Sequence, residues 1–446
     1  MIPRSCRLLA CALLLASAVC VARAAGDEDA SRRWHEWRRS RTRFPIAAWS
    51  YFGRYQGTKA EYQVYADANL TFVSAPVSQY DNALAAGLDV LLGGWEKLYE
   101  KPDLLRERTR LSNESKGNVI GYQLMDEPEP DSFKALGDAV RTIYALDKTA
   151  AIPIIDMLPN WAWERTSGRT RKYGYQYDGF IEAFIRTVRP PVLLNCHYPT
   201  LENGSDRVEY YANLETFRDH ALRNDIGLMA FVLCTDQARW YRRPSDSDLR
   251  WMVYSSLAYG AQGIWYWNWR IKPDDKYGFR EGLVLDGTGE PTGNYHRVKA
   301  VNAEILANGN VLMKLRSRNV YHTGTTVPPG TRRYPGPGDT GACAVARFVG
   351  DDFIIGEFRN QDDADDTAAY VMIVNKRHGM DKDSSDPLLR ATAIFKPSRV
   401  YTSVCRCDAV DGKQHPLESI NHEGEAGYYS VSLGGGQGIL LRLSRK

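Results

Sequence analysis

The sequence is poor in cysteine. Of its eight cysteines, three lie in the first 24 residues and five lie beyond them: Cys196, Cys234, Cys343, Cys405 and Cys407. Five is too few for a disulfide scaffold in a chain of this length, and an odd number leaves at least one free thiol. We expect Cys343 to pair with Cys405 or Cys407, because all three lie in the C-terminal region. Their spacing matches no zinc motif, and the histidines do not cluster near them. We expect a protein that works without a metal or an organic cofactor.

Long apolar runs are also lacking after the first segment. Residues 1–24, MIPRSCRLLACALLLASAVCVARA, combine arginines, an apolar run and a small-residue cleavage pattern at Ala22-Arg23-Ala24. We therefore predict a secretory signal peptide over residues 1–24 and a secreted or periplasmic protein. Residues 17–20, SAVC, fit a lipoprotein signal poorly, so a lipid anchor is the less favoured alternative. No later apolar run is long enough to form a transmembrane segment.

An excess of charge of one sign is lacking as well. The 57 basic and 54 acidic residues give a formal net charge of +3, which falls to zero when Arg4, Arg7 and Arg23 leave with the signal. Nothing in the overall charge therefore points to a nucleic-acid partner. The basic stretch SRRWHEWRRSRTR lies within residues 25–43, which we interpret as a solvated N-terminal arm. Contact of this arm with an acidic surface or polymer is the alternative.

From residue 44 to residue 314, short apolar runs alternate with longer amphipathic stretches, which is the rhythm of parallel β/α units. We predict strands at residues 44–52, 70–75, 88–95, 118–125, 151–157, 192–198, 226–234 and 263–269. Helices are predicted at residues 59–68, 96–111, 132–146, 177–188, 207–223, 246–259 and 294–306. Eight strands in about 270 residues indicate a (β/α)8 TIM barrel over residues 44–314.

Residues 315–446 change to alternating patterns without helical periodicity. The segments that read as strands are RNVYHTG, ACAVARF, DFIIGEF, AAYVMIVNK, ATAIF, VYTSVC and YYSVSLGGGQGILLRL. Turns rich in Gly, Pro and Asp separate them. This pattern is typical of an antiparallel β-sandwich, to which we assign a structural or accessory role.

The functional prediction starts from the stretch NVIGYQLMDEPEP, residues 118–130. It contains the fourth predicted strand, which runs into Asp126, Glu127 and Pro128. Proline removes a ladder donor and ends the strand pairing. In a (β/α)8 barrel the residues at the carboxyl ends of strands line the mouth where chemistry is done. Taken alone, a solvated acidic turn explains these residues equally well, so the other strand ends must decide.

Those other strand ends carry carboxylates, amides and aromatic rings. They are Trp49, Trp95, Asp156, His197, Tyr198, Asp236, Gln237, Trp267 and Trp269. This mixture suits a sugar, because carboxyl groups act at the glycosidic centre while aromatic rings stack on sugar faces. A single tryptophan is more often a core residue, and His197 is as readily a buried structural histidine. Their joint occurrence at strand ends favours a carbohydrate substrate.

These motifs resemble those of the clan A glycoside hydrolases, the (β/α)8 enzymes that include the family 5 cellulase-like and family 42 β-galactosidase-like groups. In those enzymes strand four ends in Asn-Glu-Pro with the glutamate as acid/base, strand six carries His and Tyr, and strand eight supplies a tryptophan. The matching positions are Asp126-Glu127-Pro128, His197-Tyr198, and Trp267 or Trp269. The resemblance covers roughly residues 44–315 and implies that Glu127 is the acid/base.

Two positions depart from the clan pattern. The asparagine that holds the sugar 2-hydroxyl in the clan is replaced by Asp126. Strand seven should end in the nucleophilic glutamate, but the segment MAFVLCTDQARW offers Asp236, beyond the expected end of the strand. The identity of the second catalytic carboxylate therefore stays open.

Three mechanisms remain. In the first mechanism, Asp236 is either the nucleophile or the base that activates a water molecule. In the second, Asp126 and Glu127 act together, as in the family 20 hexosaminidases that the adjacent Asp-Glu also resembles and in which the substrate's acetamido group is the nucleophile. Neighbouring strand residues point to opposite faces, so this pair requires that the strand has already turned. In the third, the barrel binds carbohydrate without cutting it.

We predict a glycoside hydrolase that cleaves a poly- or oligosaccharide with Glu127 as general acid/base. Asp126 and Asp236 are the candidates for the second catalytic role. A lyase or transglycosylase that uses Glu127 and Tyr198 is a less favoured alternative.

Overall fold

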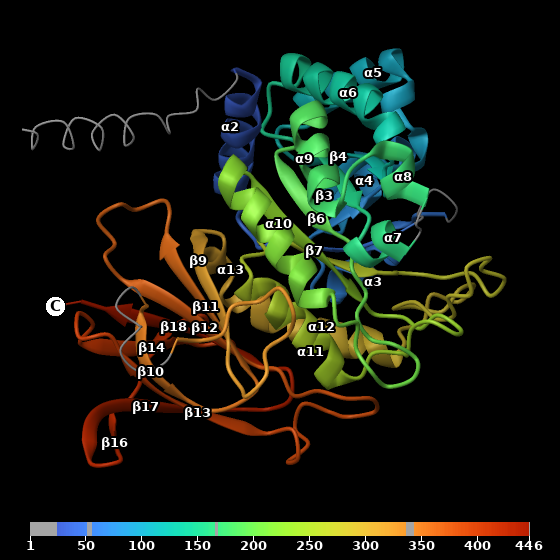
Figure 1. The fold of residues 1–446 in the computed structure, drawn as a ribbon. Helices are drawn as coiled ribbons and strands as arrows, with labels where there is room; N and C mark the ends of the chain where they lie inside the picture. Colours follow the sequence, from blue (N-terminus) through green and yellow to red (C-terminus); the bar gives the residue numbers. More distant parts are fainter. Residues whose placement is uncertain (1–24, 51–55, 166–167, 336–342, 446) are drawn as a thin grey trace, which may run out of the picture.

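The chain folds into a barrel enclosed by helices and a β-sandwich beside it (Figure 1). The computed structural model describes residues 25–50, 56–165, 168–335 and 343–445. The predicted signal peptide, residues 1–24, lies outside the described residues. The predicted fold class, a (β/α)8 barrel followed by an antiparallel sandwich, is confirmed.

The barrel sheet has eight parallel strands in the order β1-β8-β7-β6-β5-β4-β3-β2. The two ends of this order meet where the Thr71 N–H donates to the Ile46 carbonyl at 2.7 Å. The strands are largely apolar because both faces of the sheet are buried, one by the barrel interior and one by the helices. The strands are β1 (Ile46–Ala48), β2 (Phe72–Ser74), β3 (Asp89–Gly93), β4 (Val119–Asp126), β5 (Ile152–Met157), β6 (Val192–Asn195), β7 (Gly227–Leu233) and β8 (Ile264–Trp267).

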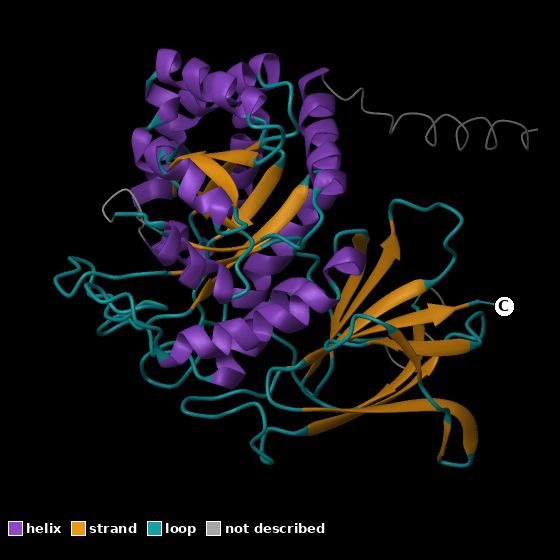
Figure 2. Cartoon of the chain, turned by 180° about the vertical axis from the view of Figure 1, so that it is seen from behind, coloured by secondary structure: helices purple, strands orange, loops and turns teal. Residues whose placement is uncertain are grey.

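Helices cover the outside of this sheet, as the view from behind in Figure 2 shows. They are α3 (Lys59–Asp67), α4 (Tyr80–Ala85), α5 (Pro102–Glu114), α6 (Phe133–Leu146), α9 (Tyr177–Val188), α10 (Tyr210–Asn224), α11 (Asp246–Ala258) and α12 (Gly293–Ala307), with short α7 (Asn160–Arg165), α8 (Gly168–Tyr173) and α13 (Gly309–Leu312). Capping boxes at Thr58 and Ser245 begin α3 and α11. The sequence prediction missed α4, whose six residues are too few to display helical periodicity. In the described part of the chain, no helix is both long and apolar enough to cross a bilayer.

Residues 25–40 form helix α2 (Ala25–Ser40), so the prediction of a solvated arm is wrong for this segment. Trp34 and Trp37 are 2% and 0% exposed, and their rings stack with centroids 5.3 Å apart. The Trp37 indole N–H donates to the carbonyl of Ile120 in β4 at 2.8 Å. Arg38 forms an ion pair with Asp362 of the sandwich. Helix α2 carries an apolar stripe among its many charged residues, and this stripe packs on the barrel.

The sandwich consists of two antiparallel sheets, ordered β10-β13-β17-β16 and β15-β14-β18-β12-β11-β9. Its larger sheet packs on α11 of the barrel, where a Cβ at Gly356 would lie 2.4 Å from the carbonyl oxygen of Ala258. Glycine is therefore required at this close approach. The strands are β9 (Leu315–His322), β10 (Val345–Val349), β11 (Phe353–Asn360), β12 (Ala369–Asn375), β13 (Ala391–Pro397), β14 (Ser403–Cys407), β15 (Gln414–Pro416), β16 (Ile420–His422), β17 (Glu425–Leu433) and β18 (Gly438–Ser444).

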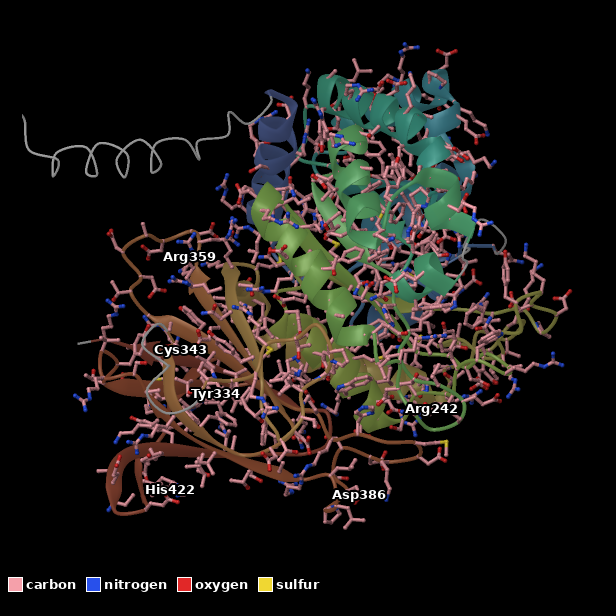
Figure 3. The ribbon with its side chains drawn as sticks, in the orientation of Figure 1. Arg242, Tyr334, Cys343, Arg359, Asp386 and His422 are labelled. Carbon is pink, nitrogen blue, oxygen red and sulfur yellow. The ribbon has the colours of Figure 1, made fainter. Side chains whose placement is uncertain are left out.

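The predicted disulfide is wrong. The five cysteines of the described chain are all free thiols. Cys405 and Cys407 both lie in β14, while Cys343, labelled in Figure 3, donates to the Tyr321 hydroxyl at 3.4 Å. The shared C-terminal location on which the prediction rested does not bring these side chains to bonding distance.

Candidate active site

Asp126 and Glu127 both lie at the mouth of the barrel, at the carboxyl end of β4. Asp126 is the last residue of the strand, and Glu127 has a φ of +44°. A left-handed φ in a residue other than glycine marks a sharp change of chain direction. The strand has therefore turned at Glu127, which meets the condition for both carboxyl groups to face the same site. Both side chains are exposed in the mouth.

Asp156 joins these two carboxyl groups from β5. The pairing of β4 with β5 shifts register between Gln123 and Met125, and the shifted register makes Asp126 and Asp156 direct partners. The Glu127 N–H donates to the Asp156 carbonyl at 3.2 Å. Although Asp126 is exposed in the mouth, the protein around it removes part of its solvation and raises its pKa, and its hydrogen bond with Asp156 opposes that effect. Burial also raises the pKa of Asp156 well above its usual value, and the charge of Asp126 raises it further.

Glu127 has a pKa suited to proton transfer near neutral pH. Surrounding protein removes much of its solvation and is the largest cause of a pKa raised to about 7, and the negative charge of Asp126 acts in the same direction. A hydrogen bond from the Cys196 thiol and the positive charge of Arg169 oppose the rise. Arg169 is itself paired with Glu129 at 2.9 Å.

Successive side chains in the segment after β6 point in opposite directions. Cys196 and Tyr198 face the carboxyl cluster, and the Cys196 sulfur lies 3.5 Å from the Tyr198 hydroxyl oxygen. His197 lies between them in sequence, is 1% exposed and packs edge-on against Tyr210 of α10, with ring centroids 5.4 Å apart. Burial lowers the pKa of His197 to about 3. Alternation along an extended chain separates the predicted His-Tyr pair, so His197 lies outside the cluster.

A pocket of about 460 Å³ opens over the ends of β1 to β4. Asp126 lines it, together with Trp49, Gln123 and Tyr99. The ring of Trp267, half-buried at the end of β8, lies 5.7 Å from that of Trp49 and 6.4 Å from that of Tyr198. Aromatic rings therefore lie beside the carboxyl cluster at the strand ends.

Asp236 is held by two arginines rather than directed at the carboxyl cluster. Arg243 donates to its Oδ1 at 2.9 Å and Arg280 to its Oδ2 at 3.1 Å, and Asp236 is 7% exposed. Gln237 next to it donates its amide to the Tyr277 carbonyl at 2.7 Å. Both predicted site residues therefore tie together the loops that follow β7 and β8.

Two predicted tryptophans contribute nothing that can be placed in the mouth. Trp269 is 2% exposed and packs edge-on against Tyr65 at 4.7 Å, so it is a core residue. Trp95 lies in the 3-10 turn η4 (Gly94–Glu96), and its side chain is outside the described part of the structure. Cys196 is the residue that sequence reasoning missed. Its signal was available, because it stands two positions before Tyr198 and so shares that residue's direction.

No protein-family model and no curated protein matches the sequence. Similar solved structures include a β-galactosidase from the psychrophilic Marinomonas ef1, at 10% identity over 61% of this chain and 62% of that chain, with a TM-score of 0.41. A protein described as a glycoside hydrolase has 11% identity over 90% and 93% and a TM-score of 0.49. The β-glucuronidase of Ruminococcus gnavus has 11% identity over 59% and 50% and a TM-score of 0.39. The chain thus spans less than two thirds of the galactosidase and the glucuronidase, and function is inferred below from its own residues.

Proposed function

We propose that the protein is a glycoside hydrolase that acts on a poly- or oligosaccharide, with Glu127 as general acid/base. The observation that carries the proposal is the meeting of three carboxyl groups, from Asp126, Glu127 and Asp156, at the mouth of the barrel. Glycosidic bond cleavage uses one carboxyl group that donates a proton and a second that acts on the other side of the reacting carbon.

The pKa of Glu127 supports the acid role. At a value of about 7, roughly half of the Glu127 side chains hold a proton at neutral pH. Glu127 gives this proton to the glycosidic oxygen as the bond from carbon to oxygen breaks. If a substrate acetamido group attacks first, the Glu127 carboxylate then takes a proton from the water that completes the reaction. If Asp126 takes the proton from the attacking water, Glu127 regains its proton from solvent after the products leave.

Asp126 is the second acting carboxyl group in this proposal. Asp236 would have to leave both Arg243 and Arg280 before it served as a nucleophile or base. Asp126 instead lines the pocket. It either orients a substrate acetamido group, whose oxygen then attacks the anomeric carbon, or takes a proton from water. The half-buried rings of Trp267 and Tyr198 supply faces on which a sugar stacks, and Trp49, which is 6% exposed, lines the pocket beside Asp126.

A substrate panel tests the proposal. Purified protein is incubated with polysaccharides and with aryl glycosides that carry or lack a 2-acetamido group, and the products are analysed for new reducing ends, unsaturation and anomeric configuration. We expect saturated products with new reducing ends. Hydrolysis confined to 2-acetamido sugars assigns Asp126 the orienting role, and hydrolysis of sugars that lack this group assigns it the water-activating role. Unsaturated products would indicate a lyase and overturn the proposal.

The ion pairs of Asp236 favour a second candidate, a barrel that binds carbohydrate without cutting it. Saturable binding of a glycan from the panel, with no product formed from any member, would distinguish this candidate from a hydrolase.

We also propose that the protein is exported and that residues 1–24 are removed. N-terminal sequencing of protein recovered outside an expressing cell is expected to begin near residue 25. A chain that retains residues 1–24 would contradict cleavage.

A further inference from the structure

Asp156 is the most enclosed of the three carboxyl groups. It is 2% exposed, whereas Asp126 and Glu127 are both exposed in the mouth. The β4-β5 register places Asp156 directly beside Asp126, and its backbone carbonyl accepts the Glu127 N–H at 3.2 Å. Asp126 lines the pocket, whereas Asp156 is buried and is not among the residues that line it. Asp156 therefore adjoins both residues of the proposed reaction from outside the pocket lining.

A hydrogen bond between two carboxyl groups needs a proton on one of them, because an ionised carboxylate has no donor. Asp126 and Asp156 are direct partners in the β4-β5 register, and a hydrogen bond between their side chains acts on the pKa values of both. Among the described residues, no Lys, Arg or His nitrogen lies within 4.0 Å of the carboxyl oxygens of Asp126, Glu127 or Asp156. Three ionised carboxylates close together without a paired cation repel one another.

The environment determines which member of the pair holds the proton. Asp126 is exposed and lines the pocket, whereas Asp156 is enclosed by protein. Burial disfavours the ionised form of a carboxyl group, so the proton is more stable on Asp156. The pKa directions agree, since the hydrogen bond between the two groups raises the pKa of Asp156 and opposes the rise at Asp126.

We propose that Asp156 works as a neutral carboxylic acid, a positioning residue that donates its proton in a hydrogen bond to Asp126 and holds that carboxylate toward the pocket. The role of Asp126 in this inference rests on the glycoside hydrolase function proposed above, whereas the protonation of Asp156 is independent of that function. Before the reaction the pair carries one negative charge, and Asp156 keeps its proton throughout.

The first test needs no substrate. Infrared difference spectra at pH 7 compare the wild-type protein with Asp156→Asn, and we expect the variant to lose one C=O stretching band of a protonated carboxyl group. Asp248→Asn is the matched control, because Asp248 is fully buried but is paired with Arg242 and His378, which lower its pKa to about 2. The control is expected to lose no such band. In the wild-type protein, the band is expected to be present at pH 7. It is expected to disappear at higher pH, where Asp156 loses its proton.

The second test uses the best substrate of the panel. Asparagine keeps a neutral hydrogen-bond donor at position 156, so Asp156→Asn is expected to retain kcat/KM within about tenfold. Asp126→Asn removes the acting carboxylate and is expected to lose about 10²- to 10⁴-fold, the size typical of a lost acid or base. Asp156→Ala removes the donor that positions Asp126 and is expected to lose about 10²-fold, the size typical of a misplaced catalytic group.

The pH profile separates this role from a merely structural one. Replacing a neutral acid by a neutral amide changes no charge beside Glu127, so Asp156→Asn is expected to leave the alkaline limb of kcat/KM in place. An ionised Asp156 would predict the opposite, because loss of its charge would lower the pKa of Glu127 and move that limb to lower pH.

The infrared and kinetic results fail in distinguishable ways. An unchanged protonated-carboxyl band in Asp156→Asn would overturn the inference whether or not the protein cleaves glycans. Loss of activity in Asp156→Asn equal to that in Asp126→Asn, with a displaced alkaline limb, would overturn it as well. If no member of the panel is cleaved, the proposed function fails while the infrared result still decides the protonation of Asp156.

Discussion

Glu127 has two neighbours that act on its pKa in opposite directions. The negative charge of Asp126 raises the pKa, and the thiol hydrogen bond from Cys196 lowers it, while burial is the largest cause of the net rise. A general acid must hold its proton when the substrate binds, so the alkaline limb of activity follows this pKa. Each neighbour can therefore be examined by the direction in which its removal moves that limb.

Removing the thiol is expected to extend activity to higher pH. In Cys196→Ala the Glu127 carboxylate loses a hydrogen bond that stabilises its charged form, so its pKa rises above about 7. The alkaline limb of kcat/KM then moves to higher pH. Cys196→Ser is the matched control, since its hydroxyl restores a donor and is expected to return the limb toward the wild-type position. A limb that moves to lower pH in Cys196→Ala would contradict this account of the site.

The residues at the site differ in how far sequence alone could predict them. Asp126, Glu127 and Asp156 were predicted, because each ends an apolar run that reads as a strand. The left-handed φ of Glu127 and the register shift beside Asp126 carry no sequence signal, since both follow from how β4 and β5 pair. His197 was expected in the mouth with Tyr198, although the strict alternation of an extended chain favours Cys196 instead.

At the scale of elements, helix α2 supports the strand that carries the site. Trp37 of α2 is fully buried, and its indole N–H donates to the carbonyl of Ile120 in β4 at 2.8 Å. Asp126 and Glu127 follow directly from that strand. The segment once expected to be a solvated arm is therefore part of the barrel's core.

Trp37→Ala is expected to destabilise the protein by about 3–5 kcal/mol, the usual cost of truncating a buried tryptophan to alanine. Urea unfolding followed by circular dichroism measures the change. Trp240→Ala is the matched control, because Trp240 is 54% exposed and its truncation is expected to cost little. Equal unfolding free energies for the two variants would show that α2 is dispensable to the barrel.

Element prediction succeeded where periodicity was long and failed where it was short or masked by charge. All eight barrel strands were found, because buried parallel strands are apolar over most of their length. Helix α4 has only six residues, and the apolar stripe of α2 is hidden among arginines. The cysteine pairing failed for another reason, since the distance between two side chains is set by the sheet and not by position in the sequence.

At the scale of the whole molecule, a buried charge cluster joins the barrel to the sandwich. The His378 ring, from the loop after β12, stacks on Trp251 of α11 with centroids 3.8 Å apart. Its two nitrogens lie 2.7 Å from Asp248 and 3.1 Å from Asp206. Arg242, labelled in Figure 3, pairs with Asp248 at 2.9 Å and Asp206 at 3.4 Å. A histidine that donates to carboxylates through both nitrogens is doubly protonated.

This cluster is expected to make stability fall as the pH rises above neutrality. Burial lowers the pKa of His378, but hydrogen bonds to Asp206 and Asp248 outweigh it and raise the pKa above its usual value. The stabilisation is fully present below the unfolded pKa of about 6.5 and is lost as the pH rises through the folded value. Urea unfolding at a series of pH values measures it.

The matched variant for this measurement is His378→Gln, which cannot titrate at this position. We expect it to lose the part of the decline in unfolding free energy that belongs to the histidine. A decline as steep in His378→Gln as in the wild-type protein would assign the pH dependence to other groups.

The most direct measurement of the central claim is the turnover of the best panel substrate by Glu127→Gln. Glutamine keeps the shape of the side chain but cannot donate or accept the catalytic proton. The account predicts a loss in kcat of about 10²- to 10⁴-fold with folding and sugar binding retained, and wild-type turnover by the matched control Glu164→Gln, an exposed glutamate of α7. Wild-type turnover by Glu127→Gln would contradict the account.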